Sequence, residues 1–207
     1  MNNKYNIYML LLKARTFIAL IAVMLFFGFM VGNFLTIDNL LIMTLHVAIT
    51  GLIAIGMTLV ILTSGIDLSV GSVVGVGGMI AGLLLTQGVP IGDDLIFFSV
   101  TGVILIVMIF GGLVGLINGV IITKFGVAPF ICTLGTLYIG RGAALLVNNG
   151  STFPNLVGFE ELGNTGFAFL GSGEILHIYV PIWIMILMTI LAVYITTKTP
   201  LGRYIYA

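Results

Sequence analysis

Charged side chains are scarce in this 207-residue chain. Aspartate, glutamate, lysine and arginine together make up 7% of the residues, whereas hydrophobic residues make up 60%. Soluble domains usually contain about a quarter charged residues, so this composition excludes an ordinary soluble protein and indicates an integral membrane protein. The seven basic residues balance the seven acidic ones, and the overall charge therefore gives no support for a nucleic-acid partner.

Cysteine and catalytic motifs are also lacking. Cys132 is the single cysteine, and one thiol cannot form an internal disulfide or a cysteine-based metal site. The sequence contains no GxxxxGK[ST] loop for nucleotide phosphates, no HExxH zinc motif and no GxSxG nucleophile turn. We therefore expect no catalytic residue, no cofactor and no metal: the chain is not an enzyme, and any ATP hydrolysis that drives it belongs to a partner.

Long apolar runs dominate what is present. A helix needs about 20 apolar residues to cross the hydrocarbon core of a bilayer, and six runs approach or exceed that length. They predict an all-α, polytopic transmembrane helical bundle that forms one domain over residues 1–207. The predicted spans are 16–35, 39–62, 70–86, 95–122, 130–147 and 178–197. The polar, glycine-rich stretch 148–177 is expected to form an external loop.

The basic residues predict how the chain is oriented. Short loops rich in lysine and arginine are retained in the cytoplasm, and six cations fall on the side that the two termini share. These cations are Lys4, Lys13, Arg15, Lys124, Lys198 and Arg203. The loops of the opposite side carry acidic residues instead, namely Asp38, Asp93, Asp94, Glu160, Glu161 and Glu174. We therefore expect a multi-pass protein with both termini in the cytoplasm.

Glycines recur at intervals of four within several spans. Such spacing places small residues on one helix face, where two backbones can approach closely. The repeats are Gly28 and Gly32, Gly71 and Gly75, Gly78 and Gly82, and Gly111, Gly115 and Gly119. Helix packing is one interpretation of these glycines, and a path for a solute is the other.

A polar segment at residues 63–72 joins two apolar runs without any lysine or arginine. Its glycines, serines and threonine predict a broken or re-entrant element, because such residues can unwind a helix where protein or water surrounds them. Asp67 lies within it. An ionisable residue at membrane depth indicates a functional site, but aspartate is also a favoured helix cap, and both interpretations stay open.

Arg141 is the one cation inside an otherwise apolar stretch. It has three possible environments: the outer interface, an ion pair with a carboxylate such as Asp67, or an aqueous path for a hydroxyl-rich solute. Asn118 and the threonines of the fifth span are either hydrogen-bonding contacts between helices or contacts to a ligand.

The stretch GMTLVILTSGIDLSVGS, from Gly56 to Ser72, resembles the permease subunits of bacterial ATP-binding-cassette importers for ribose and related monosaccharides. These belong to the branched-chain amino acid and ribose permease family. Further similar stretches follow in order: GLINGVIITKFGVAPFICTLGTLYIGRG from 115, LGSGEIL from 170, VPIWIM from 180 and TPLGRYIYA from 199. Members of that family continue beyond the point where this sequence stops, so the resemblance implies either an incomplete chain or a truncated gene product, which we do not expect to complete a transport cycle alone.

The resemblance implies a sugar permease of the bacterial plasma membrane. Its expected partners are a cytoplasmic ATPase, a periplasmic or lipid-anchored sugar-binding protein, a second permease copy and the lipid bilayer. The residues expected along the substrate path are Ser64, Asp67, Ser69, Asn118 and Arg141. On the ATPase-coupling side we expect Gly202, Arg203 and Tyr204. The resemblance leaves the sugar open, since selectivity in such systems resides largely in the binding protein.

Two other functions remain compatible with the sequence. Broken helices and isolated charges at membrane depth also mark ion-coupled secondary transporters and channels. A membrane fragment without transport activity of its own is the third possibility.

Overall fold

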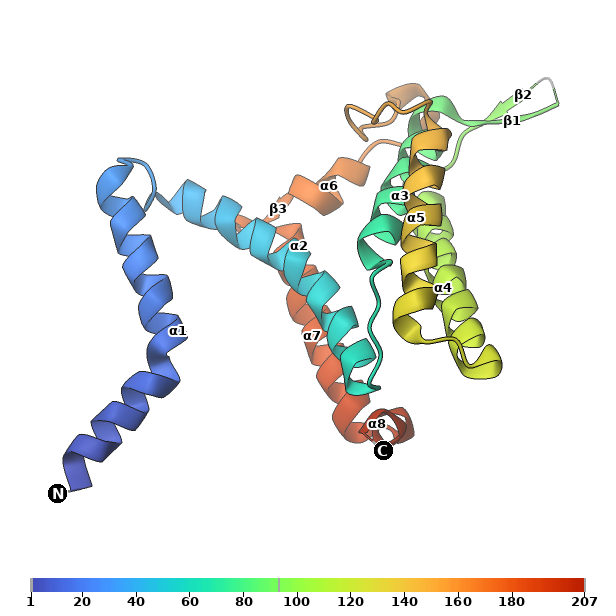
Figure 1. Cartoon of the computed structure of the whole chain (residues 1–207). Helices are drawn as coiled ribbons and strands as arrows, with labels where there is room; N and C mark the ends of the chain where they lie inside the picture. Colours follow the sequence, from blue (N-terminus) through green and yellow to red (C-terminus); the bar gives the residue numbers. More distant parts are fainter. Residues whose placement is uncertain (1, 93, 207) are drawn as a thin grey trace. The chain divides into compact units, whose positions relative to one another are not determined.

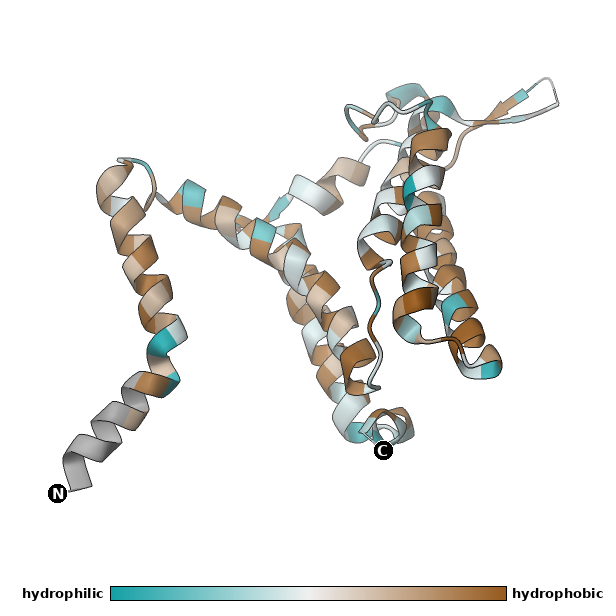
Figure 2. Cartoon of the chain, in the orientation of Figure 1, coloured by the Kyte–Doolittle hydropathy of each residue, from teal (hydrophilic) through white to brown (hydrophobic). Residues whose placement is uncertain are grey.

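The computed structural model describes residues 2–92 and 94–206. Within them, six helices are long and apolar enough to cross a membrane, which confirms the predicted all-α, polytopic architecture (Figure 1). Apolar residues cover these helices, whereas hydrophilic residues gather mainly in turns and loops (Figure 2). Asp93, one of the predicted external acids, lies outside the described residues. The chain divides into two compact units, one ending at His46 and the other beginning at Val47.

The first unit contains α1 (Asn2–Met30) and the beginning of α2 (Ile37–Leu62). Helix α1 starts well before the predicted span and ends five residues earlier than its predicted end. Gly32 and Asn33 lie in the turn that follows, in keeping with the preference of these residue types for turns. Thr36 then caps α2, because its Oγ1 accepts a hydrogen bond from the Asn39 backbone N–H at 3.4 Å.

The second unit begins within α2, and the chain loses helical geometry after Leu62. Residues 63–69 form a turn and an extended segment inside the predicted break at 63–72. Ser64 adopts a left-handed conformation with φ of 58°, and helix geometry resumes at α3 (Val70–Gly82). A single wide turn, the π-helix η1 (Leu83–Gln87), extends α3.

Three helices of the second unit pack side by side: α3, α4 (Val100–Phe125) and α5 (Pro129–Val147) (Figure 1). Ser99 caps α4 by accepting a hydrogen bond from the Gly102 N–H, and Gly126 ends the helix in a left-handed conformation. Pro129 opens α5, where its fixed φ suits the first helical turn. Helix α3 contacts both of the others and is the most buried of the six spans.

The fourth span begins later than predicted. Residues 95 and 96 belong to β2 (Asp94–Ile96), which pairs antiparallel with β1 (Val89–Ile91) in a short hairpin. Gly92 lies at the turn with φ of 67°, a conformation that glycine adopts without strain. Leu95 and Ile96 are as apolar as the helix residues that follow, so hydropathy alone did not distinguish the strand β2 from the beginning of α4.

The loop between α5 and α7, residues 148–177, contains short elements that the sequence did not predict. These are a 3₁₀ turn η2 (Glu160–Leu162), the helix α6 (Phe167–Ser172) and the strand β3 (Glu174–Ile175), which pairs with β4 (Ile178–Tyr179). Two helices follow, α7 (Val180–Lys198) and the short α8 (Pro200–Tyr206). We call residues 148–177 the α5–α7 loop.

The main apolar core of the second unit lies where this loop meets α3 and α4. Its fully buried members are Ala81, Leu84, Leu85 and Val103, and partly buried residues of the loop, including Leu156 and Phe167, pack against them. The loop is therefore part of the folded core and does not merely connect two helices.

Most glycines of the four-residue repeats are not the places where another segment comes close to the backbone. Added methyl groups at Gly71, Gly75, Gly115 and Gly119 would meet no atom within 4 Å. On Gly140, by contrast, a methyl group would lie 2.7 Å from Ser72 Oγ and 3.0 Å from Ser72 Cβ. The contact between α3 and α5 thus depends on Gly140.

We expect Gly140→Ala to destabilise the α3–α5 contact by about 1 to 3 kcal/mol, because the new methyl group overlaps the Ser72 side chain. Gly142→Ala is the matched control: it lies on the same helix with open space around it, and alanine there gains up to about 1 kcal/mol of helix propensity. Thermal unfolding in detergent should give a lower midpoint for Gly140→Ala than for Gly142→Ala. Equal midpoints would show that the two helices do not depend on this approach.

Candidate functional site

Asp67 organises the end of the helix break. Its Oδ1 accepts two hydrogen bonds from Ser69, one from the backbone N–H at 2.7 Å and one from the hydroxyl at 2.6 Å. Ser69 is the residue that precedes the first turn of α3. The carboxylate thus accepts a bond from the N–H two residues further along, just before the first turn of α3.

A chain of hydrogen bonds extends from Asp67 through the three packed helices. Asn118 of α4 donates from Nδ2 to Ser69 Oγ at 3.3 Å, and the Thr136 hydroxyl of α5 donates to Asn118 Oδ1 at 2.6 Å. The Cys132 thiol also approaches Asn118 Oδ1, at 3.6 Å. Each donor along this chain points toward the Asp67 carboxylate, and hydrogen bonds aligned in this way polarise and strengthen one another.

The extended backbone of the break is bonded to α5 as well. The Thr133 hydroxyl donates to the Ile66 carbonyl at 3.2 Å and, within its own helix, to the Pro129 carbonyl at 2.8 Å. Thr133 and Ser69 are almost fully buried, at 2% and 1% exposed. Among the described residues, no buried side-chain nitrogen or oxygen lacks a hydrogen-bond partner. The buried polar side chains around the break are therefore all hydrogen-bonded.

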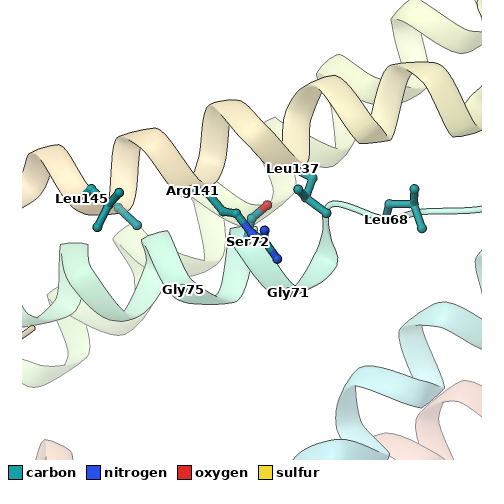
Figure 3. A pocket seen from close by; sticks show the side chains of 8 residues that line it. Leu68, Gly71, Ser72, Gly75, Leu137, Arg141 and Leu145 are labelled. Atoms are coloured by element: carbon teal, nitrogen blue, oxygen red, sulfur yellow. The ribbon is translucent and has the colours of Figure 1, made fainter. Parts of the chain in front are cut away.

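A groove runs between α3 and α5 next to this hydrogen-bonded cluster. It has a volume of about 610 Å³ and is lined largely by apolar side chains and by the open backbone of Gly71 and Gly75. Ser72 and Arg141 are its polar members. Figure 3 shows the Arg141 side chain reaching from α5 toward α3 beside Ser72.

Arg141 is exposed in this groove, and no ion pair joins it to Asp67 or to any other acid in the part of the chain that the structure describes. A guanidinium presents five N–H donors, so the groove combines one strong donor group with small and apolar walls. This combination suits a ligand rich in oxygen acceptors.

The structure brings together three of the five predicted path residues. Asp67, Ser69 and Asn118 form one cluster, in which Asn118 is 5% exposed. Ser64 lies on the exposed turn after α2, and Arg141 lines the groove, so neither shares a hydrogen bond with that cluster. Ser69 and Asn118 are buried and bonded to each other, and neither lines the groove.

The sequence pointed to the threonines of the fifth span, Thr133 and Thr136, as contacts either between helices or to a ligand, and in the structure both bond to another element. It assigned no role at the site to Cys132 or Ser72. Cys132, Thr133 and Thr136 all bond to the break or to Asn118, and Ser72 faces Arg141. A signal was present, because residues 132, 133 and 136 are spaced by three and four and so share one face of a helix. Their burial against α4 was not visible in that spacing.

The residues predicted for ATPase coupling lie on α8. Gly202 is buried, and a methyl group there would overlap the Thr196 carbonyl, so the chain must reverse direction closely against the end of α7. Arg203 and Tyr204 are exposed, Tyr204 to 82%. The short helix thus presents a cation and an aromatic ring on its surface.

Comparison with known proteins gives consistent results over nearly the whole chain. The family described as "Branched-chain amino acid transport system / permease component" matches residues 37–207. The chain is 40% identical over 205 residues to the ribose import permease protein RbsC of Haemophilus influenzae, covering 99% of this chain and 60% of the relative.

Two other ribose import permease proteins are similar. That of Escherichia coli K12 is 36% identical over 197 residues, covering 95% of this chain and 58% of the relative. That of Bacillus subtilis is 36% identical over 196 residues, covering 94% and 56%. The chain thus spans about six-tenths of the length of these curated relatives. No solved structure matches the chain.

We expect Asp67→Ala to destabilise the protein by about 1 kcal/mol, the usual cost of removing a capping side chain. Asp67→Asn is the matched variant, because its amide oxygen still accepts a hydrogen bond from the Ser69 N–H. Thermal unfolding in detergent should therefore rank Asp67→Asn close to the wild type and Asp67→Ala below both. An asparagine variant as unstable as the alanine variant would contradict a capping role that needs only an acceptor.

Proposed function

The chain belongs to the branched-chain amino acid transport system / permease component family, and from that membership we propose that it forms part of the membrane-spanning permease of an ATP-driven sugar importer. A ribose-like monosaccharide passes along it. The names of the ribose import permease relatives support a sugar as the solute, and the whole assembly performs the transport.

The observation that carries this function is the groove between α3 and α5. An arginine within a membrane span costs at least a few kcal/mol if it faces lipid, and such residues usually face a bundle interior or a water-filled cavity. Arg141 lines a groove with Ser72 and with exposed glycine backbone. A sugar offers many hydroxyl oxygens, and a guanidinium can donate to several of them at once.

The predicted path residues take different roles in this proposal. Arg141 contacts the passing sugar in the groove, and Ser64 offers its hydroxyl at the turn after α2. Asp67, Ser69 and Asn118 hold the helix break in the geometry that leaves the groove open. The path is thus formed where α3 begins, in the groove that Ser72 and Arg141 line.

The orientation follows the distribution of loop charges. In the proposed arrangement both termini face the cytoplasm of a bacterium, and the protein lies in its plasma membrane. The ATPase docks near Gly202, Arg203 and Tyr204 on α8, and the sugar-binding protein docks on the opposite side, which carries the α5–α7 loop. A second permease copy completes the assembly.

An ATP-driven importer and an ion-coupled carrier respond differently to two treatments. In cells or vesicles that hold the assembled transporter, inactivating the partner ATPase should abolish ribose uptake, whereas collapse of the ion gradients at constant ATP should leave uptake intact. Ribose that enters without the ATPase but stops when the gradients collapse would contradict the proposal. Failure of the wild-type chain to copurify with any ATPase or sugar-binding protein would favour a membrane fragment without transport activity.

We expect Arg141→Met to lower ribose uptake roughly tenfold, because it removes a charged hydrogen-bond donor worth about 1.5 kcal/mol or more to the solute. Methionine keeps the unbranched shape of the side chain in the groove. Arg141→Lys is the matched control, since it keeps the positive charge and some donors, and it should retain more uptake than Arg141→Met. Normal uptake by Arg141→Met, at equal amounts of assembled transporter, would remove Arg141 from the path.

A further inference from the structure

Two side-chain hydrogen bonds attach the α5–α7 loop to the end of α3: an exposed one from Gln87 Nε2 to Asn148 Oδ1 at 3.1 Å, and a buried one made by the amide of Asn164. Asn164 is 1% exposed, and both ends of its amide are used. Its Nδ2 donates to the Leu85 carbonyl at 3.0 Å, and its Oδ1 accepts from the Phe159 N–H at 2.6 Å. One bond therefore crosses to η1, at the end of α3, and the other holds the loop in its own fold.

The backbone carbonyl of Leu85, at the end of α3, needs a hydrogen-bond donor from another part of the chain. In η1 the Gly88 N–H donates to the Leu83 carbonyl, five residues earlier, at 2.9 Å, so this last turn is wider than an α-helical turn. Leu85 lies in this turn and is completely buried. The last carbonyls of a helix have no partner within it, and a buried one without a partner is costly. Asn164 supplies that partner.

Shape and packing reinforce the same attachment. Gly158 has φ of 76° and lies so close to the Asn164 backbone that a methyl group would overlap it. The loop residue Phe153 covers Gly82, where a methyl group would overlap its ring. Loop residue Phe159 also packs edge-on against Phe97, before α4, with ring centroids 6.1 Å apart. The loop thus follows the end of α3 closely.

We infer that Asn164 is a positioning residue that transmits movement of the α5–α7 loop to α3, and this inference rests on the proposed function. When a binding protein docks on the loop and displaces it, the hydrogen bond from the Asn164 amide to the Leu85 carbonyl displaces Leu85 as well. Leu85 lies in the same continuous helical segment as Ser72 and Gly75, which line the groove. Single wide turns within helices are frequent at functional sites, and η1 provides a turn that can change its width when the loop moves.

The test uses the assembled transporter with its ATPase in lipid nanodiscs. Basal ATP hydrolysis is compared with hydrolysis stimulated by the ribose-loaded binding protein. Asn164→Ala should keep basal hydrolysis within about twofold of the wild type while stimulation falls roughly fivefold or more, the usual lower limit of coupling between two sites. A purely structural role would lower basal and stimulated rates together, and that result would overturn the inference, as would unchanged stimulation.

Two further variants sharpen the test. Asn164→Asp keeps the acceptor for the Phe159 N–H but loses the donor to the Leu85 carbonyl, so it should lose stimulation as Asn164→Ala does. It decides the outcome if the alanine variant does not assemble, and failure of both variants to assemble overturns the inference. Asn155→Ala is the matched control, because Asn155 is an exposed asparagine of the same loop, and it should leave stimulation unchanged.

The two proposals fail in different ways. If the wild-type transporter shows ribose uptake and stimulated ATP hydrolysis but Asn164→Ala and Asn164→Asp match it, only the role of Asn164 is wrong. If the wild type shows neither ribose uptake nor stimulation by a ribose-loaded binding protein, the proposed function is wrong, and the inference about Asn164 is overturned with it.

Discussion

The hydrogen-bonding demand of the backbone inside a membrane governs this fold. No water reaches the hydrocarbon core, so a chain that leaves helical geometry there must find partners for its N–H and C=O groups within the protein. In residues 63–69, several of these groups have such partners. Asp67 binds the Ser69 N–H, and Thr133 binds the Ile66 carbonyl from another helix. The break is stabilised by polar side chains of the neighbouring helices, namely Asn118 of α4 and Thr133 of α5.

This requirement explains why the polar residues of the three packed helices separate into two groups. Asn118 is buried and Thr136 is partly buried, and their hydrogen bonds to each other and to Ser69 help to fix the geometry of the break. Arg141 lies a short way along α5, in the groove, with no acid bound to it among the described residues. One group is thus bonded within the protein, and the other group consists of a cation that is exposed in the groove.

Much of this arrangement could be predicted from the sequence because hydrocarbon imposes simple rules. Six apolar runs gave six helices, and the polar segment around Asp67 coincided with a real break in helix geometry. The boundaries were less predictable. Residues 95 and 96 are as apolar as a helix but pair in a hairpin, because Gly92 turns the chain back on the preceding strand.

The contacts between distant residues could not be predicted in the same way. Spacing of four selected Gly71 and Gly75, yet the tight approach of α3 to α5 occurs at Gly140, since the crossing point of two helices depends on their axes and not on the pattern of either one. Asn164 gave no signal at all. It lies in a polar loop of unremarkable composition, and only the burial of Leu85 in the folded chain makes its amide necessary.

Helix α3 is held at both ends by amide side chains that belong to other elements. Asn118 bonds to Ser69 at its beginning, and Asn164 bonds to Leu85 in its last, widened turn. A regular span would satisfy its backbone internally and could slide or rotate past its neighbours at little cost. A span with an extended break before it and a wide turn after it cannot, because any shift breaks buried hydrogen bonds at one end or the other. Any movement of this helix must therefore break these buried hydrogen bonds or exchange them for others.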